Sequence, residues 1–340
     1  MGRDGTGGVG PRSRGVRILG RLGALALTVV GVTALAFAVL SLAPGDPLVL
    51  RADSQRGLAL DPAARARIER QLGLDRPLPV RYLHWLAGAV RGDLGTSWRT
   101  GEPVAREIAG RLPATLELNL AALLLVTGVG APFGWWMALR AGAGRERVAG
   151  LALLALYAVP SFWLALLLQQ VLAVEWRVLP LYGRPSIAAA GVAGHFRHLV
   201  LPALALGLHQ LAFYARFARD TALAGLLGGH ARLARALGQS PARVALLHGI
   251  RPSLVPLATL LGLLVPGLAT GSVLVENIFG WPGLGRLFLR AVLDRDLPLV
   301  LGMTLVAGLL TVAGNVLADL LAALADPRLR APAVDPGGRP

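Results

Sequence analysis

The side chains with the clearest potential for chemistry include two histidines. His195 and His198 are three residues apart, a spacing at which two side chains share a helix face and could hold one metal ion. A metal site needs further ligands, and the sequence offers no cysteine and no His-Glu-x-x-His motif. The pair is interpreted as two histidines at a membrane boundary, and no metal site is predicted.

Two kinds of enzyme are disfavoured by the residues. Ser97 stands in the sequence GDLGTSW, which lacks the Gly-x-Ser-x-Gly frame of a hydrolase nucleophile. A phosphate-binding P-loop needs a lysine that contacts the phosphates, and the chain contains no lysine. We therefore expect a protein that is not an enzyme and holds no cofactor. Any work driven by ATP would use a nucleotide bound by another protein.

The composition indicates a membrane protein. The 340 residues are 54% hydrophobic and 16% charged, whereas a soluble domain carries about 25% charged residues. The net charge of +15 comes from arginines that lie mainly between apolar segments. A nucleic-acid binder gathers positive charge on one polar face, so the expected partner is the lipid bilayer and not nucleic acid.

Six stretches are apolar over roughly the 20 residues that a helix needs to cross a bilayer. The first exceeds the about 7–15 apolar residues of a signal-peptide core and is predicted to be retained. The sequence predicts an all-α, polytopic membrane protein with six transmembrane helices and a transmembrane core over 113–325. The predicted spans are 18–43, 113–139, 148–174, 198–215, 253–275 and 298–324.

Arginines in the short connecting segments predict the orientation, because cytoplasmic loops carry an excess of positive charge. These segments are the tail 1–17, the loop 140–147 and the loop 216–252. With six spans they share one side, so both termini, including the tail 326–340, are predicted to be cytoplasmic. The segment 44–112 is then extracytoplasmic, and its helix signals predict a small helical segment.

Polar residues within the predicted spans are further candidates for a function. A charged group at the bilayer centre costs about 2.5–3.5 kcal/mol, and polar groups there usually face protein or water. They can line a translocation path, or they can hydrogen-bond neighbouring helices for about 0.6 kcal/mol each. Both interpretations stay open for Asn119, Gln169, His209, Gln210 and Asn315.

The basic segment 231–252, ARLARALGQSPARVALLHGIRP, separates two apolar stretches. Arg232 and Arg235 share one face of a helix that Gly238 can end. Ser240 can then cap a second helix that begins with proline. Two short helices at a bend predict a compact cytoplasmic projection. The residues alone leave open whether it binds a partner protein or lies among lipid headgroups.

Several motifs occur in order along the chain. The segment above contains A-R-A-x-G, which is Ala234, Arg235, Ala236, Leu237 and Gly238. Others are LAPGDP (42–47), LGLDRPLPVRYLHWL (72–86), GDLGTS (92–97), RLPATLEL (111–118), VENIFGWPGLGRL (275–287), RDLP (295–298) and DPRLR (326–330). Together they resemble ABC importer permeases of the dipeptide/oligopeptide/nickel class over residues 42–330.

The resemblance implies a permease of the bacterial or archaeal cytoplasmic membrane that pairs with a second, homologous permease. Two cytoplasmic ATPase subunits would bind ATP and magnesium and grip the coupling loops, and an extracytoplasmic solute-binding protein would deliver the substrate. The implied coupling-loop residues are Arg232, Ala234, Arg235, Ala236, Gly238 and Ser240. The bend containing Glu276, Asn277, Trp281, Pro282 and Gly283 either helps to close an outer gate or is an ordinary Pro-Gly turn.

The chain also departs from the family's pattern. Arg232 replaces an acidic residue, Gly229 and His230 replace an acidic-aromatic pair, and Leu237 stands where lysine is frequent. These changes alter the detailed ATPase contacts that the resemblance implies, and the loop itself is still expected. Alternatives are a nickel or metal-chelate importer of the same family, an ion-coupled secondary transporter, and a membrane scaffold or intramembrane enzyme.

Overall fold

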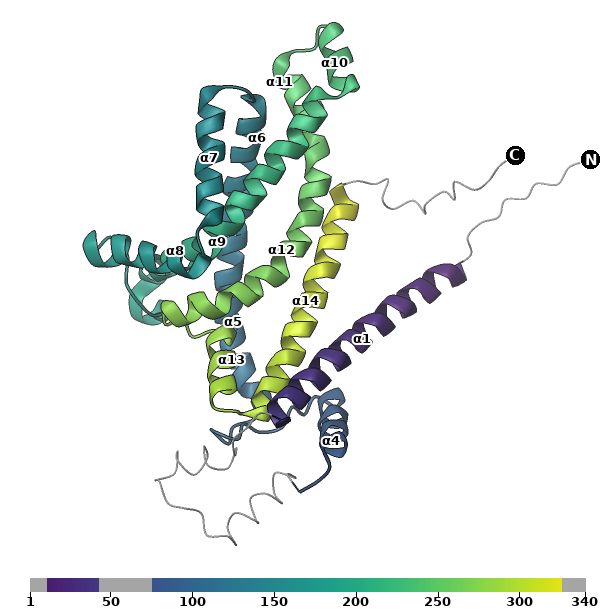
Figure 1. Ribbon diagram of the computed structural model, residues 1–340, viewed down its shortest axis with the longest axis vertical. Coiled ribbons are helices and arrows are strands. Elements are labelled where there is room, and N and C mark those ends of the chain that lie inside the picture. Colours follow the sequence, from purple (N-terminus) through teal and green to yellow (C-terminus); the bar gives the residue numbers. More distant parts are fainter. Residues whose placement is uncertain (1–10, 43–74, 326–340) are drawn as a thin grey trace, which may run out of the picture. The chain divides into compact units, whose positions relative to one another are not determined.

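The computed structural model describes residues 11–42 and 75–325 (Figure 1). Within these residues the regular elements are helices, apart from one isolated bridge between Thr96 and Pro103. The predicted all-α fold is confirmed. The chain divides into two compact units, Met1–Glu107 with Ala291–Val312 and Ile108–Arg290 with Ala313–Pro340, which are described separately. The tail 326–340 and the part 43–74 of the extracytoplasmic segment lie outside the described residues, as does most of the tail 1–17.

The helical segments follow the predicted order along the chain. Three π-helical segments continue α-helices: η1 (Val126–Gly130) joins α5 to α6, η2 (Gln169–Glu175) extends α8, and η3 (Ala245–Ile250) joins α11 to α12. The α-helices are α1 (Pro11–Leu42), α4 (Leu78–Val90), α5 (Val104–Leu125), α6 (Ala131–Leu139), α7 (Gly144–Ala158), α8 (Ser161–Leu168), α9 (Ile187–Leu227), α10 (Gly229–Ala236), α11 (Pro241–Val244), α12 (Arg251–Ile278), α13 (Leu284–Leu293) and α14 (Leu297–Ala325).

The described residues contain four helical stretches that are long and apolar enough to cross a membrane. They are Val104–Leu139, Ile187–Leu227, Pro241–Gly262 and Leu297–Gly314. The bent pair of α7 with α8 and η2 would make a fifth span, and α1 contributes the shorter apolar stretch Leu27–Leu42. The polytopic membrane fold is confirmed, whereas the count of six spans stays a prediction.

Two predicted spans differ in shape from the structure. The stretch 148–174 is not one straight helix, because it bends by 102° between α7 and α8. Pro160 disfavours helical backbone at the residue before it, and Val159 accordingly has an extended ψ of 128°. The stretch 198–215 is only the middle of the 41-residue α9, whose first turns are kinked at Gly191 (φ 66°). Polar residues at both ends concealed that length in the sequence.

In the first unit, the loop after α4 is held against the start of α14. The Ser97 hydroxyl donates to the Asp296 carboxylate at 2.5 Å, and both residues are buried. Asp296 also accepts the backbone N–H groups of Arg99 (3.2 Å) and Leu299 (3.3 Å). It therefore caps the N-terminus of α14, and Ser97 has a structural role, in agreement with the absence of a nucleophile motif.

Replacing Asp296 by alanine is expected to destabilise the protein by about 1–3 kcal/mol, because it removes the cap and leaves the Ser97 hydroxyl unpaired. The unfolding midpoint in detergent should fall measurably. Asp296→Asn is the matched control, since its side-chain oxygen can still accept the Leu299 N–H and should recover part of the loss. An alanine variant that melts like the wild type would contradict this assignment.

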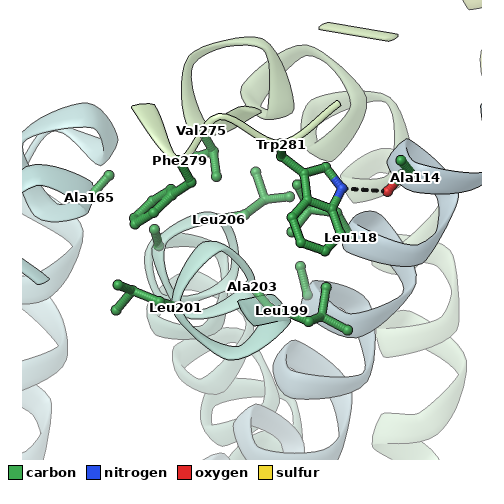
Figure 2. Close-up of a cluster of buried hydrophobic side chains, with 12 residues drawn as sticks. Ala114, Leu118, Ala165, Leu199, Leu201, Ala203, Leu206, Val275, Phe279 and Trp281 are labelled. Atoms are coloured by element: carbon green, nitrogen blue, oxygen red, sulfur yellow. Dashed lines mark hydrogen bonds between the residues drawn. The ribbon is translucent and has the colours of Figure 1, made fainter. Parts of the chain in front are cut away.

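In the second unit, α9 is the central helix, and η1, α6, α7, α8 and α12 pack around it. Glycines allow the closest approach: a methyl group at Gly134 would overlap the backbone of Ala215, and one at Gly207 would come within 2.9 Å of Leu125. Figure 2 shows the hydrophobic cluster where α5, α8, α9 and the end of α12 meet around Trp281 and Phe279. The same packing fixes the segments that carry the candidate sites.

Candidate functional site

The predicted helix, break and second helix of the basic segment are present as α10 and α11. Gly238 follows α10 with φ 76°, a backbone conformation that glycine adopts easily. The N–H of Gly238 bonds to the carbonyl of Arg235 (3.0 Å), and that of Gln239 bonds to the carbonyl of Ala234 (3.1 Å). This pair of bonds is a Schellman motif. The Ser240 hydroxyl then accepts the N–H of Arg243 at 3.4 Å and caps α11.

The two faces of α10 have different environments. Ala231 and Ala234 are buried against a cluster that includes Leu226 and Val244. On the opposite side Leu233 is 59% exposed and Leu237 is 73% exposed. Arg232 and Ala236 are also exposed. Residues four apart lie on one side of a helix, so the two leucines form an apolar ridge, which we call the α10 ridge.

Arg235, which the resemblance implies as a contact with the ATPase, has an internal partner. Its guanidinium donates to the carbonyl of Leu226 at 2.9 Å, at the C-terminal end of α9. The last carbonyls of a helix lack intrahelical partners and carry partial negative charge, so a guanidinium stabilises them. Arg235 therefore ties α10 to α9, although its side chain remains largely exposed.

The base of this projection is tightly packed. A methyl group at Gly225 would overlap the carbonyl oxygen of His248, so α9 and η3 cross at backbone contact. One at Gly249 would come within 3.0 Å of the Leu226 side chain. Closely packed segments transmit movement because they can hardly be compressed, so a displacement of α10 would be passed on to α9 and α12.

The predicted outer bend is organised around Glu276, which is fully buried. Its carboxylate accepts the Thr115 hydroxyl (2.8 Å) and the N–H of Arg286 (3.0 Å). It also accepts the N–H of Gly285 and the hydroxyl of Ser272. The Thr115 oxygen in turn accepts the N–H of Leu284 at 2.7 Å. Glu276 and Thr115 therefore cap the N-terminus of α13 and connect it to α12 and α5.

The other residues of the outer bend have separate environments. Trp281 is fully buried and its indole N–H donates to the carbonyl of Ala114 at 2.8 Å (Figure 2). Any side chain at Gly283 would overlap the Glu276 carboxylate. Asn277 bonds to the carbonyl of Val273 (2.7 Å) in its own helix, and Pro282 is exposed. The bend is thus a fixed structural turn in this conformation, and a role in gating stays a prediction.

A charged cluster next to this bend was not predicted from the sequence. Arg184 donates to one Glu117 oxygen from Nε (2.9 Å) and from Nη2 (2.6 Å). The other oxygen contacts His195 Nε2, while His195 Nδ1 lies 2.7 Å from the carbonyl oxygen of Pro185. Both ring nitrogens face acceptor oxygens, an arrangement that a protonated imidazole satisfies because it donates from both nitrogens. The cluster joins α5, α9 and the loop between η2 and α9.

The candidate path residues whose side chains the structure describes lie in different environments. Asn119 bonds to the Thr115 carbonyl (2.9 Å) in its own helix. Gln169 is buried and donates to the carbonyls of Leu181 (3.1 Å) and Ile278 (3.5 Å), so it connects neighbouring segments. His209 and Gln210 are half-buried on α9, and the side chain of Asn315 lies outside the described part of α14.

Comparison with known proteins gives the family. A family model described as "Binding-protein-dependent transport system inner membrane component" matches residues 130–331. The chain belongs to this family. A second model, "Binding-prot-dependent transport system membrane comp, N-term", matches residues 16–119.

Curated relatives agree with this assignment over nearly their whole lengths. The dipeptide transport system permease protein DppB of Escherichia coli (strain K12) is 37% identical over 336 residues, 92% of this chain and 98% of that protein. The oligopeptide transport system permease protein AppB of Bacillus subtilis (strain 168) is 37% identical over 302 residues, 88% and 94%. The di/tripeptide transport system permease protein DppB of Pseudomonas aeruginosa (strain UCBPP-PA14) is 38% identical over 329 residues, 91% and 97%.

As a member of this family, the chain is a multi-pass membrane permease of an ABC importer. The relatives do not favour the ion-coupled transporter, the scaffold or the intramembrane enzyme. The permease features that sequence reasoning missed are the α10 ridge and the charged cluster. The spacing of Leu233 and Leu237 could have revealed the ridge, whereas no local signal joins Glu117 to Arg184 and His195, 67 and 78 residues away.

Proposed function

We propose that this permease forms half of a translocation path for peptides or similar small solutes. It would pair with a second, homologous permease, receive solute from an extracytoplasmic binding protein, and dock two cytoplasmic ATPase subunits. The peptide substrate is supported by the printed names of the three relatives. The absence of lysine supports ATP and magnesium being bound by the partner ATPases. The arginine-rich short segments support a cytoplasmic location of both termini.

The α10 ridge is the observation that most strongly supports docking of the ATPase at this segment. Two exposed leucines on a short basic helix would also suit a helix lying in the lipid headgroups. However, α9 continues for 11 residues after Arg216 and ends at Leu227, so roughly 17 Å of helix follow the first arginine of its cytoplasmic half. The α10 ridge would therefore stand away from the bilayer surface, where a protein surface can cover it.

The contacts at the base of α10 support a mechanical role in this proposal. Closure of the ATPases on ATP would push on the α10 ridge. The bond from Arg235 to Leu226 would pass that movement to α9, and the backbone contact of Gly225 with His248 would pass it to η3 and α12. Both long helices would then tilt together and change access to the path.

Gentle purification from the native membrane tests the assembly. Mass spectrometry of a crosslinked preparation should identify a second permease of this family and ATPase subunits. When a crosslinkable residue replaces Leu233 or Leu237, crosslinks to the ATPase should form mainly at these two positions. Recovery of this chain alone after crosslinking would contradict the proposed partners.

Replacing Gly238 by proline is expected to abolish solute uptake while leaving the amount of protein in the membrane unchanged. Proline fixes φ near −65°, which is incompatible with the observed 76°, and it removes the N–H that bonds to Arg235. Gly238→Asn is the matched control, because asparagine tolerates the left-handed conformation. Normal uptake by the proline variant would show that the turn geometry is not needed for coupling.

A further inference from the structure

A partly exposed aromatic cluster lies beside the break between α7 and α8. The Tyr157 ring stacks on the His209 ring with centroids 4.6 Å apart and on the Phe213 ring at 6.0 Å. Tyr157 is 43% exposed and Phe213 is 39% exposed. We call these three residues the aromatic cluster; none of them belongs to the coupling loop, the outer bend or the charged cluster.

The aromatic cluster lies close to the middle of the membrane. The uncharged part of α9 runs from His198 to Ala215, 18 residues or about 27 Å, which is close to the about 30 Å of a hydrocarbon core. His209 lies 11 residues from its outer end. Tyr157 lies ten residues after Arg147, the last charge of the cytoplasmic loop, and so about 15 Å deep. Counted from the same side, His209 lies seven residues before Arg216, about 10 Å deep, so both helices place the aromatic cluster inside the hydrocarbon core.

A lipid-facing position does not suit this region. His209 and Gln210 are both half-buried at this depth, and His209 Nδ1 is buried with no hydrogen-bond partner among the described residues. The adjacent break between α7 and α8 also leaves backbone N–H groups without helical partners. Within the described part of the chain, no side chain caps the N-terminus of α8 after Pro160. Irregular backbone at membrane depth is tolerated only where it is buried in protein or lines a water-filled cavity.

We propose that the aromatic cluster is a contact site for the side chains of the peptide during passage; this inference rests on the proposed peptide substrate. Tyr157 and Phe213 offer ring faces to apolar and aromatic side chains, and His209 stacks on Tyr157 and holds that ring in place. The stretches 148–174, 198–215 and 253–275 contain no charged residue. The contact would therefore involve no ion pair, which suits a site that must release its solute.

Uptake of two dipeptides by cells carrying the complete transporter tests this site. The ratio of the initial rates for Phe-Ala and Ala-Ala is measured in the wild type, Tyr157→Leu and Phe213→Leu. The binding protein is the same in all strains, so its own preference cancels when the ratios are compared. Each variant should lower the ratio by about threefold to tenfold, the effect expected from losing one aromatic contact.

Phe196→Leu is the matched control, because Phe196 lies on the same helix, is 56% exposed and is far from mid-depth. It should leave the ratio unchanged, with all rates normalised to the permease in the membrane. One contradicting result is that the wild type imports both dipeptides and the ratio is unchanged or raised in Tyr157→Leu and Phe213→Leu. This result overturns the contact site alone. An equal fall of the ratio in all three variants overturns the contact site as well, because it would show that removing any exposed aromatic side chain has this effect. A wild type that imports neither dipeptide overturns the proposed substrate class, and the contact site with it.

Discussion

Replacing Glu276 by alanine is expected to remove most of the folded permease from the membrane. Glu276 is fully buried and accepts hydrogen bonds from the Thr115 hydroxyl and the N–H of Arg286, and from further donors in α12 and α13. Alanine would leave these donors unpaired in a packed interior and would remove the negative charge at the N-terminus of α13. Breaking a buried charged network in this way costs about 3–5 kcal/mol, a large fraction of the stability of most proteins.

The measurement is the fraction of the variant that elutes as a single folded species in detergent, together with its unfolding midpoint. Glu276→Gln is the control. Its oxygen can still accept the N–H of Arg286, and its amide can donate to Thr115, whose hydroxyl would rotate. It should be intermediate between the wild type and the alanine variant. An alanine variant that folds and melts like the wild type would show that the outer bend is held by its apolar packing and not by Glu276.

Placing glutamates on the α10 ridge is expected to abolish solute uptake without unfolding the permease. Leu233 and Leu237 are 59% and 73% exposed and contribute little to the interior. Burying a leucine in an interface is worth about 1.5–3 kcal/mol, and a buried unpaired carboxylate is strongly unfavourable. In Leu233→Glu/Leu237→Glu, docking of the ATPase should therefore fall below detection.

Copurification of the ATPase and uptake by cells are measured together for this double variant. Arg145→Glu is the control, because Arg145 is exposed in the loop 140–147, on the same predicted side. It changes a charge outside the ridge and should retain both activities. Retained ATPase copurification in the double variant would exclude the ridge as the docking surface. Loss in both variants would indicate a general electrostatic effect.

The sequence-based predictions were most accurate for structural features that depend only on residues close together in the chain. Gly238 and Ser240 were assigned as the end of one helix and the cap of the next, and both assignments are confirmed. Capping uses main-chain groups within four residues, so its signals are local. The apolar stretches likewise showed an all-α membrane protein, because spanning helices must be apolar along their length.

Other features depend on tertiary context and could not be predicted. Pro160 breaks a span, whereas Pro113 and Pro202 lie inside continuous helices. Proline permits a break, but the surrounding packing decides whether it occurs. The contact between Glu117 and Arg184 joins residues 67 positions apart. No periodicity or cap signal connects such residues, and a single sequence carries no record of their pairing.

Transport by the purified complex in proteoliposomes tests the central claim most directly. Vesicles containing this permease and its copurifying subunits are supplied with labelled Ala-Ala and the loaded binding protein on the outside. We predict accumulation only when ATP is present on the side that carries α10, with the α10-ridge double variant inactive. Accumulation driven by an ion gradient in the absence of ATP would contradict the assignment of this chain as the permease of an ATP-driven peptide importer.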